Sequence, residues 1–262
     1  MLNIIKMDLY RMKKYKSTWI LLLVMVAISA LSLLVAGLLK ANGVSSNLAK
    51  DGTMIPDTFF AIYMRSLQSG NMMILIIISS IFMVNGKFKF GYIKNIAGKV
   101  SKRYRLIVSN LITTAIFTLL LMVVTGLTCI IGSLLFLHLD VGSSSGFIRF
   151  MLVQFLLYMS FSSVIICVVS VSRSTAFSMA FLITYVTVIG PMLVLFGDLI
   201  LHNLLKVSDN FSLGNYTVMQ NIAKLGMKYD QTMYIRAIII GIIVFGFTSA
   251  ISAFAVTKKE IK

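Results

Sequence analysis

Long apolar runs constrain this chain more than any other feature. Each run is about 20 residues long, the length that an α-helix needs to cross a hydrocarbon core of about 30 Å. The composition agrees, since 58% of the residues are hydrophobic, only 12% are charged and the mean hydropathy is +0.95. Soluble domains lie outside that range. We therefore predict an all-α integral membrane protein, with residues 1–262 forming a single transmembrane domain.

The apolar runs predict six membrane spans. The second run is short for a full crossing, so its helix is expected to begin earlier, inside the apolar patch at 59–64. The third run exceeds a perpendicular span, which indicates a tilted helix. The Gly190-Pro191 pair should kink or break the fifth span. The predicted spans cover residues 18–39, 70–86, 106–137, 147–171, 176–196 and 234–256.

The segment from Asn85 to Arg105, between the second and third spans, is basic and aromatic. It has no carboxylate, and by the positive-inside bias it stays in the cytoplasm. With both termini placed there too, the inside segments hold most of the lysines and arginines, but only Asp8 and Glu260 among the acids. The net charge of +16 then reflects topology and anionic lipid rather than nucleic acid. The cations of the segment are Lys87, Lys89, Lys94, Lys99, Lys102, Arg103 and Arg105.

The first 16 residues are predicted to form an interfacial amphipathic helix. Its apolar residues recur at spacings of three and four, and lysines and arginines occupy the flanks and far side. A plain basic leader that only sets the topology is the alternative. The apolar run after it is longer than the core of a signal peptide, so we expect it to be retained as the first span. The apolar positions are Leu2, Ile5, Leu9 and Met12.

Small residues in the last span predict a seam of helix packing. Gly246 is paired with Ala250, and Ser249 with Ala253, each four residues apart on neighbouring faces. Because small residues let helix backbones approach closely inside a membrane, these positions indicate contact with another helix.

The chain lacks residues that would drive transport or catalysis without a partner. No Asp, Glu, Lys or His falls in the middle third of a predicted span, which argues against ion-coupled carriers and channels. Cys129, Cys167, His138 and His202 are not at metal-site spacing. The stretch from Gly91 to Val100 has the wrong glycine spacing for a phosphate-binding loop. We predict no catalytic residue, no metal and no cofactor bound by this chain, so a partner supplies the energy.

The basic segment and the span pattern resemble ABC-2 type permeases, the membrane half of ATP-driven exporters. After the second span, many such permeases carry Gly-Thr-Ile-Lys-Asn, then Ser-Arg, then a hydrophobic stretch with Lys-Leu-Ile. Tyr92, Lys102 and Asn110 depart from that pattern, and the similarity is closest to the small bacitracin-resistance and lantibiotic-immunity permeases. The matching stretches are Gly91-Tyr92-Ile93-Lys94-Asn95-Ile96, Val100-Ser101-Lys102-Arg103 and Ser109-Asn110-Leu111-Ile112.

The resemblance implies that the basic segment forms a coupling helix inserted in a cleft of a separate ATPase. An anchor to anionic lipid is the alternative for the same residues. The implied partners are two ATPase subunits, which bind ATP and magnesium, and a second permease that is identical or related. The implied location is a bacterial plasma membrane, with lipid but no nucleic acid as a further partner. The implied ATPase-coupling residues are Phe88, Phe90, Gly91, Tyr92, Ile93, Lys94, Asn95, Ser101 and Arg103.

These features predict the permease subunit of an exporter for a hydrophobic or amphipathic substrate. The spans offer apolar packing surface and no buried charge to compensate an ion, and an antimicrobial or toxin peptide is the leading candidate. An exporter of lipid-linked polysaccharide from the same class is one alternative. A membrane scaffold or sensor subunit that transports nothing is another, and it would need no ATPase.

Overall fold

The structure is a helical membrane protein. Five helices of the computed structural model are long and apolar enough to cross a membrane, or six if one bent pair counts as a single span. No strand runs through the part of the chain that is described. The prediction of an all-α membrane protein is therefore confirmed at this level. The described residues are 2–41, 58–89, 104–137, 146–172, 174–203, 211–226 and 230–258.

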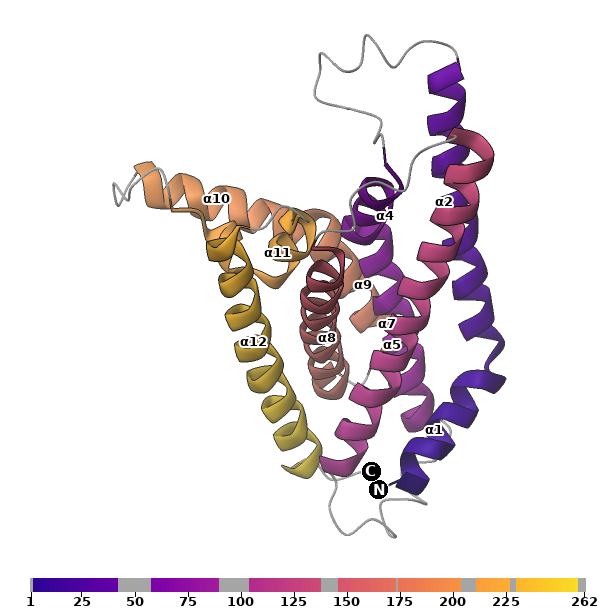
Figure 1. The fold of residues 1–262 in the computed structure, drawn as a ribbon. Helices are drawn as coiled ribbons and strands as arrows, with labels where there is room; N and C mark the ends of the chain where they lie inside the picture. Colours follow the sequence, from indigo (N-terminus) through magenta and orange to yellow (C-terminus); the bar gives the residue numbers. More distant parts are fainter. Residues whose placement is uncertain are drawn as a thin grey trace.

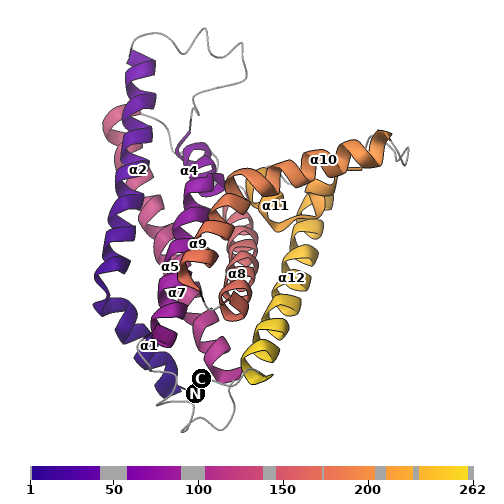
Figure 2. The same cartoon turned by 180° about the vertical axis from the view of Figure 1, so that it is seen from behind.

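The helices stand side by side as a bundle, and α10 crosses one end of it (Figures 1 and 2). Helix α1 begins and α12 ends at the opposite end, which we call the α1 end. Helices α2, α5, α7 and α8 alternate in direction along the chain, so that α5 ends and α7 begins at the α1 end. The long elements are α2 (Lys16–Ala41), α5 (Gly70–Lys89), α7 (Tyr104–Gly132), α8 (Phe147–Ser172) and α12 (Gln231–Lys258). The shorter elements are α1 (Leu2–Lys14), α4 (Phe59–Gln68), η2 (Ser133–Leu137), α9 (Thr175–Thr184), η3 (Tyr185–Ile189), α10 (Gly190–Asn203), η4 (Leu213–Tyr216) and α11 (Val218–Lys224).

Helix α8 forms the centre of the bundle. In its most apolar stretch 61% of the residues are buried, against 17% in α12. Several of its buried serines bond to the preceding turn, as when Ser162 Oγ donates to the Tyr158 carbonyl at 2.8 Å. Such bonds to the preceding turn let serine lie in a membrane interior without an unpaired polar group.

Helix α12 packs on α8 through the face that carries Gly241. Ser160 Oγ of α8 donates to the Gly241 carbonyl at 2.7 Å, and a Cβ atom on Gly241 would lie 3.3 Å from Leu156. A Cβ atom on Gly246 would meet nothing within 4 Å, and Ala250 is exposed.

Within the described chain, the predicted seam of Gly246, Ser249, Ala250 and Ala253 is therefore not the α8 contact. The observed contact runs through Gly241, Thr248 and the buried Ser252. Position 246 lies two residues from 248, which places it almost on the other side of the helix. The prediction that these small residues pack against another helix stays a prediction, because small residues let helices approach closely but do not specify which helix.

Substituting glycine on the two faces of α12 tests this assignment. Gly241→Leu is expected to destabilise the protein by about 1–3 kcal/mol, because the added side chain has no room beside Leu156 and Ser160. Gly246→Leu, the same change on the open face, should leave the stability of the single chain nearly unchanged. Thermal unfolding of both variants in detergent measures the difference. Equal losses would contradict the packing described here.

A bend separates α4 from α5. The axes of Phe59–Gln68 and Gly70–Gly86 differ by 50°, and Ser69 between them has an extended backbone. The apolar patch is thus helical, as expected, but it does not continue the second span in a straight line. The Tyr158 hydroxyl of α8 donates to the Leu67 carbonyl, and Gln68 Nε2 donates to the Leu225 carbonyl at 2.5 Å. The first bond pairs the Leu67 carbonyl, which the bend deprives of a donor from the next helical turn. The second pairs the side-chain amide of Gln68 at the end of α4.

The fifth apolar run also changes direction. Residues 175–201 are long enough to span a membrane, yet α10 turns away from α9 and runs across the end of the bundle (Figure 2). The Gly190 N–H bonds the Tyr185 carbonyl, five residues back, and a Cβ atom at Gly190 would lie only 2.7 Å from that oxygen. Pro191 follows without a donor of its own. The predicted kink therefore coincides with a wide helical turn that only glycine fits closely.

Candidate functional site

The described residues nearest the predicted coupling segment lie at the α1 end. Helix α5 ends there at Lys89 and α7 begins there at Tyr104, so residues 90–103 connect two helices at this end of the bundle. The coupling residues from Phe90 to Arg103 lie outside the described residues. Phe88 lies in the last turn of α5, where the structure describes the backbone alone.

Helix α1 packs against the bundle through its apolar stripe. Met12 is buried, Leu9 packs against the core, and Ile5 is half-buried. The side chain of Leu2 lies outside the described set. The helix contacts α7 in particular, so α1 is held by protein on the side where its apolar residues lie.

A buried carboxylate joins α1 to α7. Only 3% of Asp8 is exposed, and Ser109 Oγ of α7 donates to its Oδ2 at 2.5 Å. Asn110, the next residue of α7, is also buried and lines the space around the carboxylate together with Met83 of α5. Ser109 and Asn110 belong to the last stretch of the permease-like pattern. In the structure, Ser109 and Asn110 both lie where α7 contacts α1.

Arg11 and Tyr15 extend this cluster to α5. Arg11 donates to the Tyr15 hydroxyl at 2.7 Å, and its other terminal nitrogen lies 3.9 Å from Asp8 Oδ1. A Cβ atom on Gly86 of α5 would lie 3.3 Å from the Tyr15 hydroxyl, so a glycine permits this close approach. Helix α1 and its junction with α2 therefore contact both helices that flank residues 90–103.

Sequence reasoning missed Asp8 as a buried group. An acid among lysines at an amphipathic helix suggests a solvated charge, and the spacing of the apolar residues does not identify the side that meets α7. A signal was present in retrospect, since Asp8 falls one residue before Leu9 and four before Met12, on the packed side of the helix.

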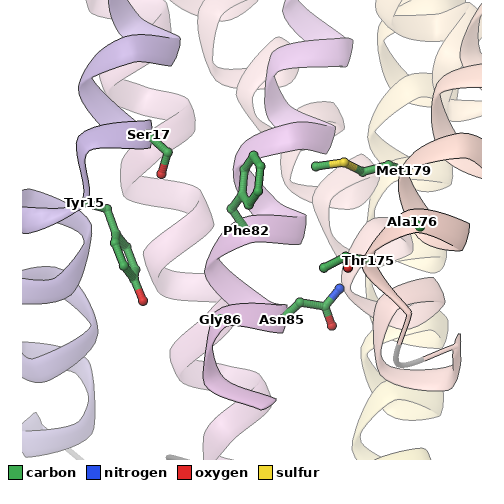
Figure 3. Close-up of a pocket in the computed structure, with 8 residues that line it drawn as sticks. All are labelled: Tyr15, Ser17, Phe82, Asn85, Gly86, Thr175, Ala176 and Met179. Atoms are coloured by element: carbon green, nitrogen blue, oxygen red, sulfur yellow. The ribbon is translucent and has the colours of Figure 1, made fainter. Parts of the chain in front are cut away.

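A pocket opens beside this cluster. It has a volume of about 430 Å³ and lies between the α1–α2 junction, α5 and the start of α9 (Figure 3). Asn85 is 4% exposed, and neither polar atom of its amide has a hydrogen-bond partner among the described residues. The lining residues are Tyr15, Ser17, Phe82, Asn85, Gly86, Thr175, Ala176 and Met179.

The described part of the chain shows no cluster of side chains that could hold a metal ion. No three His, Cys, Asp or Glu side chains gather there as a metal site. Cys129 is a buried free thiol, and Cys167 is a half-buried one. Outside the membrane spans, the Thr232 hydroxyl holds the pKa of the Asp230 carboxyl below its ordinary value, and Asp230 accepts the Thr232 N–H at the start of α12. These groups stabilise a helix end.

The comparisons with known proteins assign no family. A scan against protein-family models finds no match to the chain, and a search of curated proteins finds none either.

Proposed function

We propose that this chain is the permease subunit of an ATP-driven ABC exporter, with six spans and both termini in the cytoplasm. One observation carries the proposal. Of the helices that flank the basic aromatic segment, α7 is joined to α1 by the buried hydrogen bond between Ser109 and Asp8, and α5 lies close to Tyr15, directly after α1, through Gly86. A force applied to that segment by a partner would reach several spans together, since packed helices transmit displacement as rigid elements.

The proposed assembly contains two ATPase subunits and two permeases, either identical or related. The coupling segment, residues 87–105, docks on the ATPase in the cytoplasm. ATP and magnesium bind to the ATPases, and their closure moves the spans between inward-facing and outward-facing states. The exposed Gly246 and Ala250 face of α12 is available for contact with the second permease. The membrane is the plasma membrane of a bacterium.

The proposed substrate is hydrophobic or amphipathic, with an antimicrobial or toxin peptide as the leading candidate. The described spans expose large apolar side chains over long stretches, and their charged residues stand near helix ends. A path between such helices offers dispersion contacts and a few hydroxyls. It offers no buried charge at mid-membrane to compensate an ion.

Co-purification with a candidate ABC ATPase tests the proposal. We expect wild type to retain the ATPase in mild detergent and a Tyr92→Ala, Ile93→Ala double variant to lose most of it, because both side chains belong to the proposed docking surface. Anchoring to anionic lipid alone would leave ATPase binding unchanged in the variant.

A matched control replaces the same residue types at the other end of the bundle. Tyr216 and Ile235 are exposed there, 52% and 47% respectively, and their double alanine variant should bind the ATPase as wild type does. If wild type inserts normally into membranes and retains no ATPase, the exporter proposal fails and a scaffold or sensor role takes its place.

A further inference from the structure

Among the described residues, the buried amide of Asn85 has no hydrogen-bond partner. The side chain is 4% exposed, and its Nδ2 and Oδ1 atoms are both without a partner in the described chain. A primary amide offers two donors and an acceptor, and leaving them unpaired away from water is costly. A group that binds in the adjacent pocket and offers both a donor and an acceptor would satisfy it.

The walls of the pocket are mostly apolar and therefore favour a ligand with a large apolar part. Phe82, Ala176 and Met179 face the space near Asn85, while the hydroxyls of Tyr15 and Thr175 lie around it (Figure 3). The volume of about 430 Å³ falls within the range of small-molecule sites. None of the described lining residues is charged. The polar end of an occupant is therefore expected to be uncharged.

The pocket is accessible from the membrane side of the bundle. Phe82 of α5 is 45% exposed, and Thr175 and Ala176 at the start of α9 are exposed as well. Nearby large apolar side chains, Trp19 on α2 and Phe177 on α9, also face outward. In a bilayer these surfaces lie against lipid, so a lipid chain can enter between α2 and α9 without crossing water.

We infer that the pocket beside Asn85 binds an uncharged glycerolipid that carries a free hydroxyl next to an ester, as a monoacylglycerol does. Its hydroxyl and ester carbonyl supply the donor and the acceptor that the amide lacks. Its acyl chain lies along Phe82, Ala176 and Met179. A diacyl phosphatidylcholine fits less well, because its polar end offers acceptors and charges but no donor.

Photolabelling tests this site directly. The chain is placed in phosphatidylcholine nanodiscs with a monoacylglycerol whose acyl chain bears a diazirine, and the labelled peptides are identified by mass spectrometry. We expect labelling at Phe82 and Met179 that unlabelled monoacylglycerol competes away. Asn85→Leu, which keeps the volume and removes the amide, should weaken binding about tenfold through the lost hydrogen bonds.

Two further variants separate a built site from general lipid contact. Ala176→Trp fills the pocket and should abolish the labelling, whereas Ala27→Trp, an exposed alanine on α2 outside the pocket, should leave it intact. A probe with both hydroxyls methylated should bind wild type as weakly as the free-hydroxyl probe binds Asn85→Leu. Labelling that is equal in wild type, Asn85→Leu and Ala176→Trp would show annular lipid only and overturn the assignment, as would absence of label at Phe82 and Met179.

Thermal unfolding keeps the test independent of labelling yield. Without added lipid, Asn85→Leu should melt at or above the wild-type temperature, because it removes an unpaired buried amide. Monoacylglycerol should raise the melting temperature of wild type and not of the variant. An equal rise in both proteins would overturn the proposal. Neither photolabelling nor thermal unfolding involves the ATPase, so failure of the lipid site can be distinguished from failure of the exporter function.

Discussion

Replacing Tyr158 with phenylalanine is expected to lower the free energy of unfolding by about 1–3 kcal/mol. The tyrosine is fully buried in α8, and its hydroxyl donates to the Leu67 carbonyl near the end of α4. The bend after Gln68 removes the next helical turn that would have supplied a donor to that carbonyl. Phenylalanine fills the same volume without the donor, so the change isolates the hydrogen bond. Denaturant or thermal unfolding in detergent measures the loss.

The control for Tyr158 is the same change at an exposed position. Tyr104, on α7, is 42% exposed, and Tyr104→Phe should alter the stability by a few tenths of a kcal/mol at most. Hydrogen exchange gives a local readout, since the amides after Ser69 should exchange faster in Tyr158→Phe if the bond holds the bend. Matching stabilities for Tyr158→Phe and Tyr104→Phe would mean that the bend needs no help from α8.

The same bend shows why sequence predicts these helices better than their shapes. Hydropathy over a run of residues determines whether a segment is a membrane helix, and the predicted range 147–171 nearly equals the observed Phe147–Ser172. The bend at Ser69 instead depends on Tyr158, which is 91 residues from Leu67 along the chain. The kink near Gly190 was predictable because glycine and proline act on their own backbone.

In the candidate site too, local sequence predicts some features, and others depend on contacts with distant parts of the chain. The basic segment was evident from local charge, whereas the burial of Asp8 requires α7 to lie against one particular side of α1. By sequence, Asn85 stands at the overlap of the predicted second span, 70–86, and the basic segment that begins with it. In the structure it belongs to α5 and lies beside α9, a neighbour that no local pattern specifies.

Arg11→Leu is expected to destabilise the protein by about 3 kcal/mol, because it leaves the Asp8 carboxylate buried without its cation. Asp8→Leu should cost less than that, since the Arg11 side chain is partly exposed and keeps its contact with Tyr15. The Asp8→Leu, Arg11→Leu double variant should regain part of the loss, because neither charge then remains buried. Unfolding measurements on the four proteins form a double-mutant cycle. Strictly additive losses would mean that the two side chains do not interact.

The control for this cycle is Lys13→Leu, which removes an exposed cation from the same helix and should change stability little. Under the proposed function, the cycle also has a second readout. Near 20 °C, where Arg11→Leu is still folded, the variant should bind the ATPase normally but export less substrate per ATP, because the contacts of Arg11 with Asp8 and Tyr15, which brace α1 beside α7 and α5, are lost. Normal export by Arg11→Leu would contradict the idea that α1 transmits movement from the coupling segment to the spans. The movement would then pass through α5 and α7 alone.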